Sequence, residues 1–288
     1  MTAELLKGAP VAARLNEQTK KAAARLAEQG VTATLAILRV GDRPDDVSYE
    51  KSSTKRCESL GISVKSVVLP EDAAQSELMS CIAELNADET VHGILMLRPL
   101  PKHLDEEAAC DALLPEKDVD GVTDSSLAGV FTASGRGFCP CTAHAAAELL
   151  DYYGIDCEGK NVVIIGRSLV VGRPLAMLLM HKNATVTICH TRTKELPSVT
   201  RRADMIVATA GRPKMIKAEH LSPGQILIDV GINVDENGVL CGDVDAEEAV
   251  DWASALTPVP GGVGTVTTSI LAANVVKAAQ NSVDGGGL

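Results

Sequence analysis

Residues 162–174 limit the possible folds of this chain more than any other segment. Four apolar residues, 162–165, are followed by Gly166, and a second glycine, Gly172, precedes Pro174 and another apolar run. A short run of mostly β-branched residues that ends at a glycine indicates a buried strand. Strand, glycine turn and helix in succession present backbone N–H groups to phosphate, so the segment predicts the nucleotide-binding unit of a doubly wound sheet. The Gly-x5-Gly spacing differs from G-x-G-x-x-G, and an ordinary strand-to-helix turn is the alternative.

The residues after the next predicted strand, 184–189, bear on the choice of cofactor. A dinucleotide-binding unit contacts the ribose of the adenosine half at this point, and an acidic residue there would favour NAD. This chain has Arg192 instead, and Arg167 lies in the glycine turn. Because a guanidinium binds phosphate oxygens in pairs, we expect NADP, with NAD as the alternative. The competing interpretation of each arginine is a solvated surface charge.

Composition excludes several classes of function. A net charge of −11 and 2% aromatic residues argue against a nucleic-acid partner, which needs basic groups and rings that stack on bases. No apolar run has the length of a membrane span and no signal peptide is recognisable, so we expect a cytoplasmic protein without a membrane partner. The eight cysteines and six histidines lack metal-binding spacing, so reduced thiols and no metal are expected.

Helices and strands are predicted to alternate along the chain, which indicates parallel sheets. The expected helices are about 3–29, 45–60, 73–85, 142–153, 175–180 and 268–281; the expected strands are 32–40, 63–69, 92–97, 162–165, 184–189, 205–208 and 226–229, with a hairpin near 237–238. We therefore expect two α/β domains with a cleft between them. We expect the first domain to span residues 1–142, with a C-terminal helix at about 268–288 packed back on it. Residues 143–267 form a Rossmann-type NAD(P)-binding domain.

Two further stretches fall outside this alternation. Residues 117–121 form an acidic loop, and residues 257–264 are rich in Gly and Pro. Gly and Pro fix a backbone path and remove side chains, which suits a flat ring lying against main chain. A rigid linker between domains is the alternative for 257–264.

Together these motifs resemble those of the methylenetetrahydrofolate dehydrogenase/cyclohydrolase family. The resemblance covers essentially the whole chain and rests on residues 117–121, 140–142, 166–168, 171–172, 229–232, 242–244 and 257–264. It implies that NADP oxidises 5,10-methylenetetrahydrofolate to the 5,10-methenyl form, which the same enzyme then opens to 10-formyltetrahydrofolate. It also implies that the domain of residues 1–142 is the folate-binding catalytic domain. A homodimer is implied as well, with the tetrahydrofolate derivative bound in the cleft.

The resemblance further implies roles for individual residues. Asp120 matches the aspartate that hydrogen-bonds the pterin, and Tyr49 matches the tyrosine that packs over the folate ring. Gly166, Arg167, Ser168, Thr191 and Ile232 match cofactor-contact positions, to which the glycine turn and the phosphate argument add Gly172 and Arg192. The loop beside the nicotinamide and folate is matched by 261–264, and Pro260, Gly261 and Gly262 are assigned to substrate binding. The alternative for Asp120 is that it only organises its loop together with Asp118.

This chain departs from the family pattern at several positions. The family's catalytic lysine, four residues after the tyrosine, is Ser53 here, and the glutamine that partners that lysine is Leu97. Arg98 stands where the family has an apolar residue, Asp46 replaces a serine, and 264–265 replaces a Gly-Pro pair.

The paired loss of lysine and glutamine predicts a change of function. Ser53 shares a helical face with Tyr49, whereas Lys51 and Lys55 are predicted to point away. Hydride transfer needs alignment of donor and acceptor, but hydrolysis needs an acid–base group worth a factor of about 10²–10⁴. We therefore predict a dehydrogenase with weak or absent cyclohydrolase activity, in which Leu97 lines the substrate site. The alternatives are a fully bifunctional enzyme, an oxidoreductase of shikimate-dehydrogenase type and a non-catalytic folate-binding protein.

Overall fold

The computed structural model describes residues 3–285, which divide into two compact units. One contains the chain up to Ala13 and Thr142–Thr267; the other contains Arg14–Cys141 and the chain from Thr268 onward. We call them the six-strand unit and the three-strand unit, after their main sheets.

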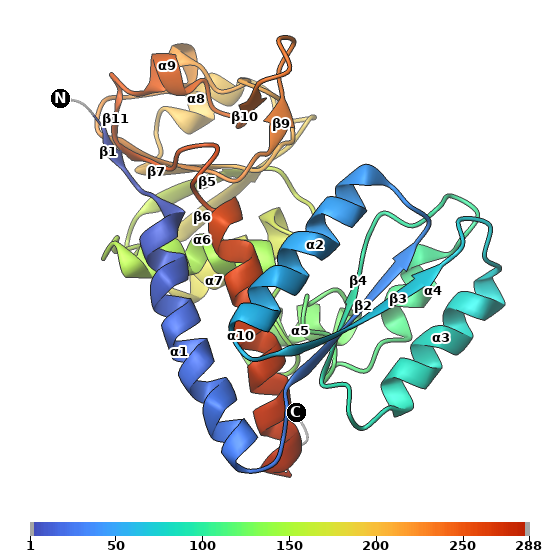
Figure 1. The fold of residues 1–288 in the computed structure, drawn as a ribbon. Helices are drawn as coiled ribbons and strands as arrows, with labels where there is room; N and C mark the ends of the chain where they lie inside the picture. Colours follow the sequence, from blue (N-terminus) through green and yellow to red (C-terminus); the bar gives the residue numbers. More distant parts are fainter. Residues whose placement is uncertain (1–2, 286–288) are drawn as a thin grey trace. The chain divides into compact units, whose positions relative to one another are not determined.

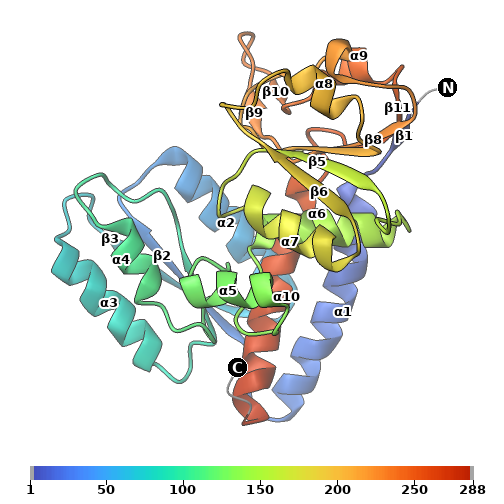
Figure 2. The same cartoon turned by 180° about the vertical axis from the view of Figure 1, so that it is seen from behind.

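The three-strand unit is built on a parallel sheet in the order β3 (Ser63–Leu69), β2 (Thr34–Val40), β4 (Gly93–Met96). Helices α3 (Gln75–Ala87) and α4 (Glu106–Asp111) cover one face, where apolar side chains of both helices form a core with β2 and β4. The remaining helices are α1 (Gly8–Glu28), α2 (Pro44–Ser59), α5 (Asp124–Thr132) and α10 (Gly264–Val283). Within this unit the later turns of α1 and α10 run side by side (Figures 1 and 2).

The six-strand unit has the doubly wound architecture expected from the sequence. Its main sheet is parallel throughout, in the order β1 (Glu4–Leu5), β11 (Ala253–Leu256), β8 (Gln225–Asp229), β7 (Met205–Ala208), β5 (Asn161–Ile165), β6 (Thr185–Cys189). Helices α8 (Leu196–Thr200) and α9 (Ala246–Ala249) with the 3₁₀ turn η1 (Ala218–His220) lie on one face, and α6 (Cys141–Tyr152) and α7 (Gly172–His181) lie on the other (Figures 1 and 2). A small antiparallel hairpin, β9 (Asn233–Val234) and β10 (Leu240–Cys241), completes the unit. The expected Rossmann-type sheet is confirmed.

Strand order fixes where a ligand can approach this sheet. The chain leaves β5 for β6 on one side and then crosses to β7 on the other side of β5. In open α/β sheets the crevice for ligands lies at the carboxyl ends of the strands, at this reversal. The turn that begins with Gly166 directly follows β5 and therefore lies at this crevice.

The N-terminal segment differs from the expectation of one continuous helix starting near residue 3. Glu4 and Leu5 form β1, which pairs with β11, and α1 begins only at Gly8. The residues up to Ala13, which the sequence analysis assigned to the first domain, consequently belong to the six-strand unit. A Cβ at Gly8 would lie 2.1 Å from the Gly262 carbonyl oxygen, so a glycine at the start of α1 lets the 257–264 loop pass.

Candidate functional site

The turn after β5 is packed so closely that neither of its two glycine positions has room for a side chain. A Cβ on Gly166 would lie 2.1 Å from Thr209 Oγ1, and a Cβ on Gly172 would lie 2.3 Å from the Gly166 carbonyl oxygen. Gly166 also has a φ of +132°, which residues with a side chain rarely adopt. Ser168 Oγ accepts the Val171 N–H at 3.1 Å and orders the approach to α7. The turn thus presents backbone next to a helix N-terminus, which fits the diphosphate of a dinucleotide.

The turn after β6 is ordered by a histidine and a threonine. His190 Nδ1 accepts the Arg192 N–H at 3.1 Å, and the His190 N–H donates to Thr193 Oγ1 at 2.9 Å. Thr191 and Arg192 are exposed, as are Arg167 and Ser168 in the preceding turn. Two accessible guanidiniums thus lie in the turns that follow neighbouring strands, which suits a phosphate on the adenosine ribose.

A pocket of about 170 Å³ lies elsewhere in the six-strand unit, at the ends of β8 and β11. Its wall consists of residues 229–232, Leu240 and 258–265. The wall is largely backbone: a Cβ on Gly262 would lie 2.6 Å from the Pro258 carbonyl oxygen, and Pro260 and Gly261 are exposed. Ile232, assigned above to the cofactor, is 65% exposed. Such a wall can accept a flat ring.

One buried carboxylate, Asp229, lines this pocket, and a second, Asp243, is not part of its wall. Sequence reasoning recognised both only as parts of family motifs. Asp229 is 4% exposed and Asp243 is fully buried. Burial raises the pKa of Asp229 to about 7. The hydrogen bonds that Asp229 accepts from backbone N–H groups oppose that rise. No sequence signal beyond the motif itself identified these residues, because their partners are backbone N–H groups of distant loops.

In the three-strand unit the structure brings Tyr49 and Asp120 together. Burial raises the pKa of Tyr49 well above 10, and the neighbouring Asp120 charge raises it further. Burial also raises the pKa of Asp120, to about 6, while Arg98 and a hydrogen bond with the Cys141 thiol lower it. Asp120 therefore titrates close to neutral pH, which is common for carboxyls at functional sites.

The two aspartates of the 117–121 loop have different environments. Asp118 is buried and accepts the N–H groups of Val122 (2.9 Å) and Thr123 (2.8 Å) and the Ser126 hydroxyl (2.7 Å). Asp118 therefore organises the loop, while the carboxyl of Asp120 is coupled electrostatically to Arg98 and Tyr49. This division favours a substrate-binding role for Asp120 over the purely structural alternative.

Ser53 and Leu97 lie in the same unit and are both buried. Ser53 lowers the pKa of Tyr49, against the larger effect of burial, but its Oγ makes no well-formed hydrogen bond to any residue between 3 and 285. Lys51 and Lys55 are exposed, as the helical spacing predicts. α2 thus presents a hydroxyl, and neither of these two amines, on the face that carries Tyr49.

Charged side chains surround the segment that follows β4. Arg98 Nη1 lies 3.7 Å from Glu106 Oε1, and Glu106 Oε2 accepts the Leu100 N–H at 2.7 Å. Arg43, at the start of α2, donates to the Pro99 carbonyl oxygen at 2.7 Å and lies 3.8 Å from Asp46. Burial raises the pKa of Asp46, and Arg43 counteracts that rise.

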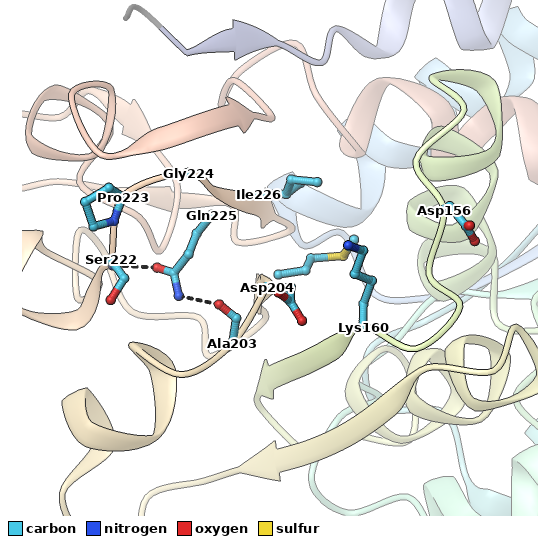
Figure 3. Close-up of a pocket in the computed structure, with 10 residues that line it drawn as sticks. Asp156, Lys160, Ala203, Asp204, Ser222, Pro223, Gly224, Gln225 and Ile226 are labelled. Carbon is cyan, nitrogen blue, oxygen red and sulfur yellow. Dashed lines mark hydrogen bonds between the residues drawn. The ribbon is translucent and has the colours of Figure 1, made fainter.

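A second pocket of the six-strand unit, about 210 Å³, is larger but lies at the wrong edge of the sheet. It surrounds the amino ends of β7 and β8 and is lined by Lys160, Asp204 and Gln225 among others (Figure 3). Gln225 is occupied there by structural hydrogen bonds, accepting from Ser222 N–H at 2.8 Å and donating to the Ala203 carbonyl at 2.7 Å. Ligands of open α/β sheets bind at the opposite edge, so this hollow is not the cofactor site.

Residues 3–285 contain neither a metal-binding cluster nor a membrane-spanning helix. No group of three or more His, Cys, Asp and Glu side chains there could hold a metal ion. No helix in that part of the chain is long and apolar enough to cross a membrane.

Comparison with known families and proteins agrees with this geometry. The tetrahydrofolate dehydrogenase/cyclohydrolase catalytic domain matches residues 6–120, and the NAD(P)-binding domain of the same description matches residues 140–283. A curated relative, "Bifunctional protein FolD" of Clostridioides difficile, is 47% identical over 277 residues, which cover 96% of each chain.

Solved structures give the same result. The bifunctional enzyme FolD of Campylobacter jejuni superimposes with a TM-score of 0.95 at 41% identity, covering 97% of this chain and 99% of that one. The Trypanosoma brucei enzyme, solved with NADP and an inhibitor, gives 0.93 at 33% identity, covering 98% and 99%. Shikimate dehydrogenase of Aquifex aeolicus shares the fold only, with a TM-score of 0.54 at 15% identity over 88% of this chain and 97% of that one. This chain belongs to the tetrahydrofolate dehydrogenase/cyclohydrolase family.

Proposed function

We propose that this protein oxidises 5,10-methylenetetrahydrofolate to 5,10-methenyltetrahydrofolate with NADP, and that its cyclohydrolase activity is weak or lost. The observation that carries the proposal is the presence, on one chain, of an intact glycine turn and the Tyr49–Asp120 pair without an amine at position 53. The cofactor supplies the hydride acceptor. The chain's own residues bind and align the two rings, which is the main requirement of hydride transfer.

The proposed folate contacts are the residues that the family motifs assign to the substrate. Tyr49 packs over the pterin, Asp120 accepts its hydrogen bonds, and Leu97 gives an apolar contact. Pro260, Gly261 and Gly262 offer backbone to the same substrate, and Ser53 takes the place of the catalytic lysine without its charge. On the nucleotide side, Gly166, Arg167, Ser168, Gly172, Thr191, Arg192 and Ile232 hold NADP.

The direct test is reduction of NADP. Purified protein supplied with 5,10-methylenetetrahydrofolate and NADP should produce the absorbance of NADPH, and omission of either substrate should abolish it. No absorbance change with NADP or NAD at saturating folate would refute the dehydrogenase assignment. Turnover of shikimate with no turnover of folate would support the shikimate-dehydrogenase alternative instead.

Arg192→Ala and Arg167→Ala are expected to raise the KM for NADP about ten-fold or more, with little effect on the KM for NAD. The reason is that a charge-assisted hydrogen bond to phosphate contributes about 1.5–3 kcal/mol, and NAD has no 2′-phosphate. Initial rates with each nucleotide measure the difference. Arg173→Ala, an exposed arginine in the first turn of α7, is the control. Equal effects on NADP and NAD would contradict the phosphate assignment.

Arg98→Leu is expected to move the acid limb of the dehydrogenase pH profile upward by about one unit, because an opposite charge lowers a carboxyl pKa by about that much or more. The pKa of Asp120 is about 6 with Arg98 present, and Arg98 lowers it. Activity that needs the carboxylate falls as pH drops through this pKa, so removing Arg98 must shift the fall to higher pH. Arg98→Lys keeps the charge and is the control. An unchanged limb in Arg98→Leu would show that Asp120 ionisation does not set it.

We also propose a cytoplasmic homodimer. All eight cysteines are free, which suits a reducing compartment. β6 is an edge strand of the main sheet and exposes Thr187 and Ile188, so a second copy could pair with it. Light scattering of the purified protein tests the oligomeric state, and a charge introduced by Ile188→Lys should shift a dimer towards monomer.

A further inference from the structure

Asp243 binds four donors from two loops of the six-strand unit. Its Oδ2 accepts the N–H groups of Ala210 and Gly211, the latter at 3.1 Å. Its Oδ1 accepts the Arg212 N–H at 2.8 Å and Asn233 Nδ2 at 2.9 Å. One fully buried carboxylate therefore joins the loop after β7 to the base of the β9–β10 hairpin.

Asp229 continues this network towards the pocket. Its carboxylate accepts the N–H groups of Gly231 (3.0 Å), Asp243 (3.0 Å) and Val244 (2.8 Å). The Asp229 N–H donates to Thr257 Oγ1 at 2.7 Å. Thr257 is the first residue of the 257–264 loop, so the network spans four chain segments.

Two glycines show how tightly the loops fit around these carboxylates. A Cβ on Gly231 would lie 2.3 Å from Asp243 Oδ1, and a Cβ on Gly242 would lie 1.9 Å from Asp229 Oδ2. Neither glycine position has room for a side chain beside these carboxylates. The family motifs around residues 229–232 and 242–244 thus have a physical explanation in this contact.

The segments held in this way form the wall of the 170 Å³ pocket. Residues 229–232 and 258–265 line it directly, whereas Asp243 is absent from the lining. Asp243 therefore cannot act by touching a ligand. Its carboxylate can act only through the groups that it holds, and one of these is the side chain of Asn233, the residue that follows the exposed Ile232.

We infer that Asp243 is the positioning residue for the nicotinamide end of the cofactor, acting through Asn233 and the segment that carries Ile232. The assignment rests on the proposed NADP-dependent function. An ionised carboxylate suits four donors because it offers only acceptors, and charge-assisted hydrogen bonds are stronger than neutral ones. An asparagine of the same shape would turn an NH₂ group towards N–H donors and release at least one loop.

Asp243→Asn is expected to weaken NADPH binding in the absence of folate at least ten-fold and to raise the KM for NADP similarly, with the KM for the folate unchanged. Fluorescence titration of NADPH and initial rates measure the two effects. Loss of folded protein alone would lower the apparent kcat for both substrates and leave each KM unchanged, so the split distinguishes positioning from stability. Asp245→Asn, two residues further along the chain at the start of α9, is the matched control.

Asn233→Ala provides a second test if Asp243→Asn does not fold. It removes only the Nδ2 donor to Asp243 and should raise the KM for NADP several-fold with the folate KM unchanged. Unaltered NADPH affinity and KM in folded Asp243→Asn, or in Asn233→Ala where Asp243→Asn fails, would overturn the inference. Failure of the wild-type protein itself to bind NADPH would refute the proposed function, a result that the wild-type titration reports separately.

Discussion

Methenyltetrahydrofolate is expected to open in the presence of this protein at close to its spontaneous rate, at least about 10²-fold slower than a competent acid–base site would allow. Hydrolysis needs water to attack and protons to move to and from the adduct. The hydroxyl of Ser53 is buried and poorly hydrogen-bonded, and its high intrinsic pKa makes it a weak proton donor or acceptor. Leu97, 6% exposed, offers no hydrogen bond that could orient a base or a water molecule.

The measurement is the decay of methenyltetrahydrofolate absorbance below neutral pH, where spontaneous opening is slower, with and without enzyme. The dehydrogenase rate of the same preparation shows that the protein is active. Catalysed decay comparable to that rate would refute the prediction and imply another base. Lys51→Ala and Lys55→Ala would then identify it, although both lysines are exposed on α2.

A gain-of-function pair tests whether the amine is the missing group. Ser53→Lys combined with Leu97→Gln should restore part of the hydrolysis, because an amine and its hydrogen-bonding partner return to the face that carries Tyr49. Burial lowers a lysine pKa towards neutrality, which favours proton transfer. Ser53→Met with Leu97→Gln adds similar length without the amine and should stay inactive in hydrolysis. Equal recovery in both pairs would show that volume, not the amine, was missing.

The features that sequence reasoning predicted are those fixed by nearby residues. The strand at β5, the turn between Gly166 and Gly172 and the helix α7 follow from a short apolar run and two glycines. The outward orientation of Lys51 and Lys55 follows from helical periodicity alone. Each depends on residues close in sequence, where local propensity and packing agree.

The features that sequence reasoning missed depend on contacts between distant segments. β1 has only two residues and exists because β11, about 250 positions later, pairs with it. α1 starts at Gly8 and not near residue 3, and the Gly8 N–H donates to the carbonyl oxygen of the distant Gly261 at 2.8 Å. The position of Arg98 close to Asp120 could not be read from the loop sequence. Nor could the four donors that converge on Asp243.

Asp120→Asn is expected to lower kcat/KM for 5,10-methylenetetrahydrofolate by about 10–100-fold while NADPH binding stays unchanged. A carboxylate that accepts hydrogen bonds from the pterin contributes about 1.5–3 kcal/mol, and the amide loses the charge and replaces one acceptor with a donor. Steady-state kinetics with varied folate and a separate NADPH titration measure the two effects. Asp124→Asn, an exposed aspartate at the start of α5, is the control. Normal folate kinetics in folded Asp120→Asn would restore the interpretation that Asp120 only organises its loop.

The pH profile of the same variant separates binding from loop structure. In the wild-type protein the Asp120 carboxyl has a pKa of about 6, because burial raises it more than Arg98 and Cys141 lower it. Dehydrogenase activity should therefore fall as pH drops through about 6, where the carboxylate takes up a proton. Asp120→Asn cannot titrate, so its residual activity should lack this limb, whereas Arg98→Leu should keep the limb and shift it upward. An identical limb in the wild type and in Asp120→Asn would assign the titration to another group and contradict the placement of Asp120 against the pterin.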